Sequence, residues 1–201
     1  MKFLIDKSKK DVIRKSKSPL VVGQLQTPLT NYAHWGGTFA IDNGAYSGFR
    51  EKAFLSLVKR RLPVAAQCLF VVCPDVVGDA AATLLKWQLL RHLIPEGYKV
   101  AFVAQDGATV KSIPWYHIDC LFLGGTDPWK DSIEAQLIVL EAKLRGKHVH
   151  VGRVNAYERY VLYRDLGADT CDGSGVARYD HMLTKLEVRL GMVPTQFDEV
   201  S

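Results

Sequence analysis

The residue types best suited to chemistry in this chain are carboxylates, amides and glycines, and they recur where short apolar runs end. In chain order, the motifs are Asp42-Asn43-Gly44, Asp75, Gln105-Asp106, Gly124-Gly125 and Asp172-Gly173. Parallel α/β proteins keep their catalytic groups at the carboxyl ends of successive buried strands. The pattern therefore predicts an enzyme whose site is rich in carboxylates.

The acids near these strand ends can be separated by position into site candidates and structural residues. Asp79 precedes a helical pattern and is expected to be its N-cap, which leaves Asp75 as the better site candidate. Asp169 and Asp172 lie three residues apart on an extended strand, so their side chains face opposite sides. Asp172 ends the strand and is expected to enter a pocket, whereas Asp169 is expected to be structural.

Three further motifs are candidates for substrate binding. Gly44, in the turn after Asp42, allows the backbone to approach a ligand closely, although the turn has a purely structural interpretation as well. Gln105 and Asp106 offer an amide and a carboxylate to a heterocycle, and Gly124-Gly125 offers backbone without side chains.

Strand-like and helical runs alternate along much of the chain. The expected strands are Phe3–Ile5, Leu20–Val22, Thr38–Ile41, Cys68–Cys73, Lys99–Ala104, Cys120–Leu123, Lys147–Val151 and Asp169–Cys171. The strands are continuous apolar runs, which implies burial on both faces, as in a parallel sheet covered by helices.

The helical patterns carry recognisable start and stop signals. One covers Ala80–Leu93, and another covers Ala156–Leu166, where Asn155 and Glu158 have an approximate capping-box spacing. A third opens at Asp127-Pro128, with Asp127 as the expected N-cap. Its apolar residues at helical spacing are Ile133, Leu137, Leu140 and Leu144.

About eight strands in 201 residues leave roughly 25 residues per unit, near the lower size limit of a (β/α)₈ barrel. We therefore expect one α/β domain over residues 1–201, folded as a compact or incomplete TIM-like (β/α)₈ barrel. An open doubly wound sheet is the alternative, because a strand pattern alone does not demonstrate closure.

The composition, 48% hydrophobic and 23% charged, is typical of a globular protein. No apolar stretch approaches the roughly 18 residues of a membrane span, and the N-terminus does not resemble a signal peptide, so a cytoplasmic protein is expected. Four cysteines form no CxxC pair and are expected to be reduced core residues. The net charge of +5 is concentrated in residues 2–17 and at Lys59-Arg60-Arg61, which suits a polyanionic partner or a solvated basic face.

The order of these motifs resembles that of the tRNA-guanine transglycosylases, and more closely that of their small phage and bacterial DNA-modifying relatives of the DpdA type. The resemblance runs from about Gly37 to Asp180. It is carried by Phe39–Gly48, Pro74–Asp79, Phe102–Gly107, Leu123–Gly125, Val151–Asn155 and Gly167–Gly173.

The resemblance implies a role for each matching residue. Asp172 matches the nucleophile, and Asp42 matches the acid that shuttles a proton for the incoming base. Asp75 and Gln105 match residues that recognise the guanine edge, and Gly124-Gly125 matches a pair that contacts the same base through its backbone.

The chain lacks the cysteine- and histidine-bound zinc subdomain of the tRNA enzymes, which favours the DNA-type relatives. The implied reaction exchanges guanine in DNA for a 7-deazaguanine base of the preQ0 kind, through a covalent aspartyl–sugar intermediate and without a cofactor. The target guanine must be flipped out or met in a single strand. Arg153 and Arg178 are candidate phosphate contacts, with surface arginine as the alternative. A homodimer is a further expectation from the family.

Four other functions remain open at this point. A tRNA-guanine transglycosylase-like enzyme would act on RNA, and a hydrolase would remove the base without replacing it. His148 and His150 share one face of a strand and could be metal ligands, as in metal-dependent TIM-barrel hydrolases, although no metal is expected here. A nucleic-acid-binding protein without catalysis would explain the basic N-terminal segment.

Overall fold

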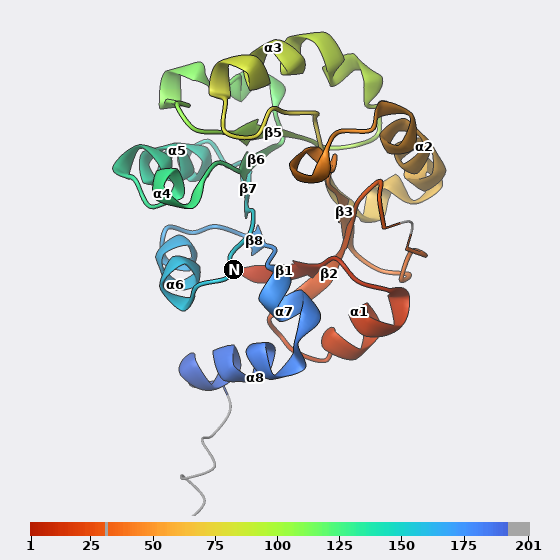
Figure 1. Cartoon of the computed structure of the whole chain (residues 1–201), viewed down its shortest axis with the longest axis vertical. Coiled ribbons are helices and arrows are strands. Elements are labelled where there is room, and N and C mark those ends of the chain that lie inside the picture. The colour runs from red at the N-terminus through yellow and green to blue at the C-terminus, as the bar shows by residue number, and fades with distance from the viewer. Residues whose placement is uncertain (31, 193–201) are drawn as a thin grey trace, which may run out of the picture.

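Eight parallel strands close into a barrel in chain order, with β8 paired to β1, in this computed structural model, which describes residues 1–30 and 32–192 (Figure 1). The strands are β1 Lys2–Ile5, β2 Val21–Gln26, β3 Phe39–Ile41, β4 Cys68–Val72, β5 Val100–Ala104, β6 Cys120–Leu123, β7 His148–Val151 and β8 Thr170–Cys171. The TIM-like barrel is thus confirmed, and the open sheet is wrong.

All eight expected strands are present, but β2 extends four residues beyond the predicted end at Val22, to Gln26. Its buried glutamines are the reason. Gln24 donates its amide N–H groups to the carbonyls of Lys7 and Ala33, and Gln26 donates to the Gln24 side chain. Because these amides are satisfied internally, polar residues occupy a buried strand without the apolar signal that marks the others.

Helices form the outer layer of the barrel, and this layer is incomplete. The α-helices are α1 Lys9–Lys15, α2 Glu51–Arg61, α3 Ala80–Leu90, α4 Asp127–Lys130, α5 Ile133–Leu144, α6 Tyr157–Asp165, α7 Ser174–Arg178 and α8 Asp180–Arg189. Short 3₁₀ turns lie at η1 Ala45–Ser47, η2 Leu62–Gln67, η3 Arg91–Leu93, η4 Val110–Ser112 and η5 Trp115–His117. Only η4 and η5 connect β5 to β6, so the barrel closes in a short chain by replacing a helix with turns.

One predicted helix start is confirmed and two are wrong. Asp79 caps α3 by accepting from the N–H of Ala82. The segment after β6 forms two helices, and Thr126 and Ser132 cap them in place of Asp127. No capping box precedes α6, because the side chain of Asn155 accepts from the N–H of Gly175 instead.

The apolar stripe of α5 that the periodicity suggests is its exposed side. Ile133 and Leu144 are 75% and 83% exposed, and Leu137 and Leu140 are exposed as well. The side that packs on the barrel consists of Ala135, Ile138, Val139 and Ala142. Since α5 is apolar around most of its circumference, periodicity alone did not distinguish its two sides.

β1 to β6 contribute residues to two separate apolar clusters, whereas the apolar residues of β7 and β8 enter only the first of them. The first cluster lies between the strands and the helices. The other fills the barrel interior and consists of Leu4, Leu25, Ala40, Phe70, Val72, Ala101, Val103, Cys120 and Phe122. All four cysteines are buried and free, as expected. No helix among the described residues combines the length and apolar character needed to cross a membrane.

Candidate functional site

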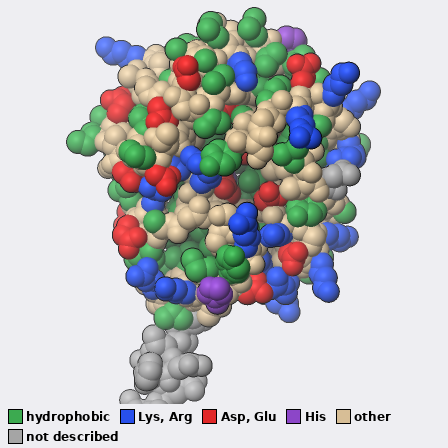
Figure 2. Space-filling view, viewed as in Figure 1, with side chains coloured by type: hydrophobic (Ala, Val, Ile, Leu, Met, Phe, Trp, Pro, Cys, Tyr) green, Lys and Arg blue, Asp and Glu red, His purple; other side chains and the backbone are tan. Residues whose placement is uncertain are grey.

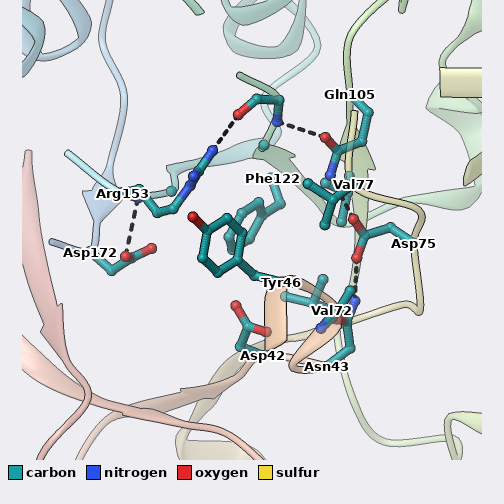
Figure 3. Close-up of a pocket in the computed structure, with 15 residues that line it drawn as sticks. Asp42, Asn43, Tyr46, Val72, Asp75, Val77, Gln105, Phe122, Arg153 and Asp172 are labelled. Carbon is teal, nitrogen blue, oxygen red and sulfur yellow. Dashed lines mark hydrogen bonds between the residues drawn. The ribbon is translucent and has the colours of Figure 1, made fainter. Parts of the chain in front are cut away.

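The carboxyl ends of the strands surround a pocket with about 500 Å³ of space (Figure 3). Most of the residues predicted for the site line it, namely Asp42, Asp75, Gln105, Gly124, Gly125, Arg153 and Asp172. Apolar side chains from the barrel interior, Val72, Val103 and Phe122, form its floor. Closure of the barrel therefore brings together residues that are far apart in the sequence, such as Asp42 and Asp172.

Asp75 and Gln105 form one wall of the pocket through a buried hydrogen-bond network. Asp75 accepts from the side-chain amides of Asn43 at 2.7 Å and of Gln105 at 2.6 Å. Gln105 in turn accepts from the backbone N–H groups of Gly125 at 2.8 Å and Gly78 at 2.9 Å. Burial raises the pKa of Asp75, and the two amide donors oppose that rise. The network holds both side chains in one orientation while leaving lone pairs of the carboxylate for a ligand.

The two glycines after β6 are required by close packing. A Cβ at Gly124 would lie 2.8 Å from the amide nitrogen of Gln105, and a Cβ at Gly125 would lie 2.4 Å from the ring of Trp129. Their backbone N–H groups already donate within the protein, Gly124 to Ala104 and Gly125 to Gln105. In this structure the glycines therefore shape the wall, and the second amide hydrogen of Gln105 is the donor that remains for a ligand.

Asp42 is an acid suited to proton transfer near neutral pH. Burial raises its pKa from 3.8 to about 7, and the neighbouring carboxylates of Asp172, Asp75 and Asp6 add to the effect. The N–H of Gly44 donates to Asp42 at 2.6 Å and partly opposes the rise. General acid–base catalysis is most efficient when the pKa of the group lies near the working pH.

Asp172 lines the same pocket as Asp42, and both of its carboxylate oxygens are held by hydrogen bonds. Oδ1 accepts from the backbone N–H of Arg153 at 3.1 Å, and Oδ2 lies 3.1 Å from Nε2 of His150. Its side chain is 18% exposed, so it remains accessible from the pocket. Asp169 faces away, as expected, and pairs with Lys143 at 2.6 Å.

Arg153 lines the pocket instead of projecting from the outer surface. Its φ of 57° is in the left-handed region, which is unusual for a residue with a side chain. The fully buried Lys130 donates to the carbonyl of Gly152 at 2.9 Å and anchors the turn. The Arg153 guanidinium donates to the carbonyl of Gly125 at 2.6 Å and lies 4.5 Å from the ring centre of Tyr46.

Two residues at the site were not predicted from the sequence. Tyr46 is 70% exposed, and its ring projects over the pocket beside Arg153 (Figure 3). Asp6 follows β1, and its Oδ1 is buried without a hydrogen-bond partner among the described residues. Burial raises the pKa of Asp6 to about 6, and the charge of Asp172 contributes. The run Phe3–Ile5 before Asp6 is the same signal that marked the other acids, so the sequence contained a basis for finding it.

A wider cleft continues from the pocket, and the two share Asp42, Tyr46, Arg153 and Asp172. Gly44 and Arg178, the remaining predicted site residues, line this cleft, as do Lys7 and Asp6.

The basic residues of the sequence divide into structural and exposed groups. Lys15 is buried and pairs with Asp180, and Arg61 donates to Gln26 and to the carbonyl of Tyr32. Exposed members of the two basic clusters are Lys2, Lys9, Lys10, Arg14, Lys17, Lys59 and Arg60. Figure 2 shows lysine and arginine side chains gathered on the side of the molecule formed by α1 and α2.

His148 and His150 point into the barrel interior and do not form part of a metal site in this structure. Within residues 1–30 and 32–192, no group of three or more histidine, cysteine, aspartate or glutamate side chains is arranged to hold a metal ion. His150 instead bonds to Asp172 and Thr170.

A search against known protein families finds none that matches this chain, and a search of curated proteins finds no match either.

Proposed function

We propose that this protein is a glycosyltransferase that exchanges guanine in DNA for a 7-deazaguanine base of the preQ0 kind, through a covalent intermediate on Asp172. The observation that carries the proposal is the pairing of two differently held acids in one pocket. Asp172 has both oxygens fixed by hydrogen-bond donors, whereas Asp42 has a pKa near 7. This difference suits one acid to nucleophilic attack and the other to proton transfer.

In the first step, an oxygen of Asp172 attacks C1′ of the target nucleotide, and the bond from C1′ to N9 of guanine breaks. The bonding electrons go to N9, and the protonated form of Asp42 donates its proton so that guanine leaves as a neutral base.

In the second step, Asp42 takes the N9 proton of the incoming 7-deazaguanine. N9 then attacks C1′, and the Asp172 carboxylate leaves. Two displacements retain the configuration at C1′, and the proton balance of Asp42 is restored.

The pocket wall offers groups complementary to a guanine edge. Each oxygen of the Asp75 carboxylate accepts one internal hydrogen bond and has a second lone pair, which suits the N1–H and 2-amino donors of guanine. The remaining amide hydrogen of Gln105 suits O6. Adenine has neither an N1–H nor a 2-amino donor, so the same wall would reject it.

Stacking and charge support a flat base attached to a polyanion. Tyr46 and the guanidinium of Arg153 lie over the pocket, and Phe122 lies below it. The cleft beyond the pocket contains Lys7 and Arg178, which suit phosphate groups of the attached strand. The choice of DNA over RNA rests on the resemblance to the DNA-type relatives.

The test incubates the protein with preQ0 and either guanine-containing DNA, single-stranded and duplex, or tRNA. The nucleic acid is then digested to nucleosides for mass spectrometry. Deazaguanine nucleoside from DNA supports the proposal. Labelling of tRNA alone would reject the DNA substrate, and abasic sites without labelling would indicate a hydrolase.

A test variant and a matched control variant are available at the two acids that flank β8. Asp172→Asn should abolish both exchange and any covalent DNA adduct, because the amide is a poor nucleophile. Asp169→Asn is the matched control, since Asp169 lies outside the pocket and contacts Lys143. Equal activity of both variants would remove Asp172 from the nucleophile role.

A further inference from the structure

A line of polar side chains runs inside the barrel beneath Asp172. His148 and His150 on β7 and Thr170 on β8 face the interior, where the imidazole of His150 is fully buried. Thr170 Oγ1 lies 2.8 Å from Nε2 of His148 and 3.0 Å from Nδ1 of His150. Nε2 of His150 then lies 3.1 Å from Oδ2 of Asp172.

The packing around this line is apolar and holds the imidazole of His150 in place. The rings of Phe122 and Phe70 lie 4.6 and 5.1 Å from it, centre to centre. His150 does not line the pocket, so it would act on a substrate only through Asp172.

For a neutral His150, the hydrogen-bond chain has only one direction that suits an ionised Asp172. A carboxylate only accepts, so Nε2 of His150 must carry a proton, and in the neutral ring Nδ1 is then an acceptor. The hydroxyl of Thr170 therefore donates to Nδ1 of His150, and its oxygen accepts from Nε2–H of His148. Burial lowers the pKa of His148 to about 4, which keeps that ring neutral. The neutral ring with its proton on Nε2 can donate to the hydroxyl oxygen of Thr170. The opposite direction would require either a protonated Asp172, which is not a nucleophile, or a His150 that carries protons on both ring nitrogens.

We infer that His150 is a positioning residue for Asp172, held in its Nε2–H form by Thr170 and His148. This inference rests on the proposed function. Together with the backbone N–H of Arg153, His150 fixes both oxygens of the carboxylate and thus the direction of attack on C1′. Its loss should lower the rate of the covalent step without changing the affinity for the base.

The hydrogen-bond chain can be tested without any substrate. Nitrogen NMR of protein labelled in its six histidines, assigned with Thr170→Val and His150→Gln, reports which ring nitrogen of His150 carries a proton. The expected result at neutral pH is a proton on Nε2 and none on Nδ1. A proton on Nδ1 alone, or on both nitrogens, would overturn the inference.

The effect on the reaction is tested with variants of similar volume. His150→Met removes the donor and should lower kcat about 10- to 100-fold, because a hydrogen bond to a charged group is lost, while KM for the base stays the same. His150→Gln keeps an N–H donor and should recover most of that loss. Cys120→Ala is the control, because Cys120 belongs to the same interior cluster and does not line the pocket.

Thr170→Val tests whether the residues act as one chain. The substitution should lower kcat in the wild-type background and have little further effect in His150→Met. Additive losses, or an unchanged kcat in His150→Met, would overturn the inference. If no base exchange is detected at all, the proposed function fails, whereas the NMR result still decides whether the chain exists. Where His150→Met does not fold, His150→Gln and Thr170→Val carry the comparison.

Discussion

Replacing Asp42 by Asn should abolish activity while making the protein more stable at neutral and higher pH. Burial and neighbouring carboxylates raise the pKa of Asp42 from 3.8 to about 7. Asn has the same shape and keeps an oxygen that can accept from the N–H of Gly44. The substitution therefore removes the titration of this site and leaves its local hydrogen bond in place.

The sign and size follow from proton linkage. Between about pH 4 and pH 7 the unfolded chain loses the Asp42 proton while the folded protein keeps it, so the folded state is progressively destabilised as the pH rises. The pKa of Asp42 is 3.8 in the unfolded chain and about 7 in the folded protein. This difference destabilises the folded protein by at most about 4 kcal/mol, a limit that is reached above pH 7. The stability gained by Asp42→Asn should thus grow by up to about 3 kcal/mol between pH 5 and pH 8.

Urea denaturation of both proteins at pH 5 and pH 8 measures this difference. Thermal unfolding should show the same trend, at about 2 to 4 °C per kcal/mol for a domain of this size. Asp165→Asn is the control, since Asp165 is exposed and Arg164 lowers its pKa, so no stabilisation at high pH is expected. A gain that is independent of pH, or a loss at pH 8, would refute the assignment of Asp42 as an acid with a raised pKa.

Three further predictions concern other residues of the site. Asp6→Asn should stabilise the protein above about pH 6 by up to about 3 kcal/mol, because burial raises the pKa of Asp6 to about 6. If this is wrong, urea denaturation will give the same difference in stability between variant and wild type below and above pH 6. Gly125→Ala should lower the free energy of unfolding by about 1 to 3 kcal/mol more than Gly146→Ala, as measured by chemical denaturation. Both glycines have positive φ, but only at Gly125 would the new Cβ lie 2.4 Å from the ring of Trp129. Equal losses of stability would contradict the packing argument. Tyr46→Ala should raise KM for the incoming base, because the stacking ring is lost, and should change stability by no more than about 0.5 kcal/mol, because that ring is 70% exposed. Tyr46→Phe keeps the ring and should match the wild type in steady-state kinetics. An unchanged KM in Tyr46→Ala would exclude stacking of the base on Tyr46.

Much of the barrel could be predicted because its signals are local. Each buried strand is a short apolar run, and a helix cap such as Asp79 depends on residues within one turn. The predicted helix starts were wrong where several neighbouring residues could serve equally well as the N-cap. Thr126, Ser132 and Asp127 are all good cap residues, so the position of the chain after β6 decided between them.

Most members of the site were predictable from the sequence, with Asp6 and Tyr46 as exceptions, but the contacts between them were not. Asp75 and Gln105 end neighbouring strands, which placed them near each other. The expected phosphate contact of Arg153 stays a prediction, whereas the contacts of its guanidinium with the carbonyl of Gly125 and the ring of Tyr46 were not expected. That outcome depends on a positive φ at Arg153, which no sequence pattern indicated.

By itself, the sequence determined the eight strands, their burial in a parallel sheet and the acids and amides that follow them, because strand burial and capping are encoded within a few residues. Only the tertiary structure decided that the strands close, that Asp6 joins Asp42 and Asp172 at one rim, and that His150 lies beneath Asp172. The physical reason is that closure, burial and pKa arise from contacts between residues far apart in the chain. A carboxylate therefore acquires its distinct chemistry only when the folded barrel sets its neighbours and its access to water.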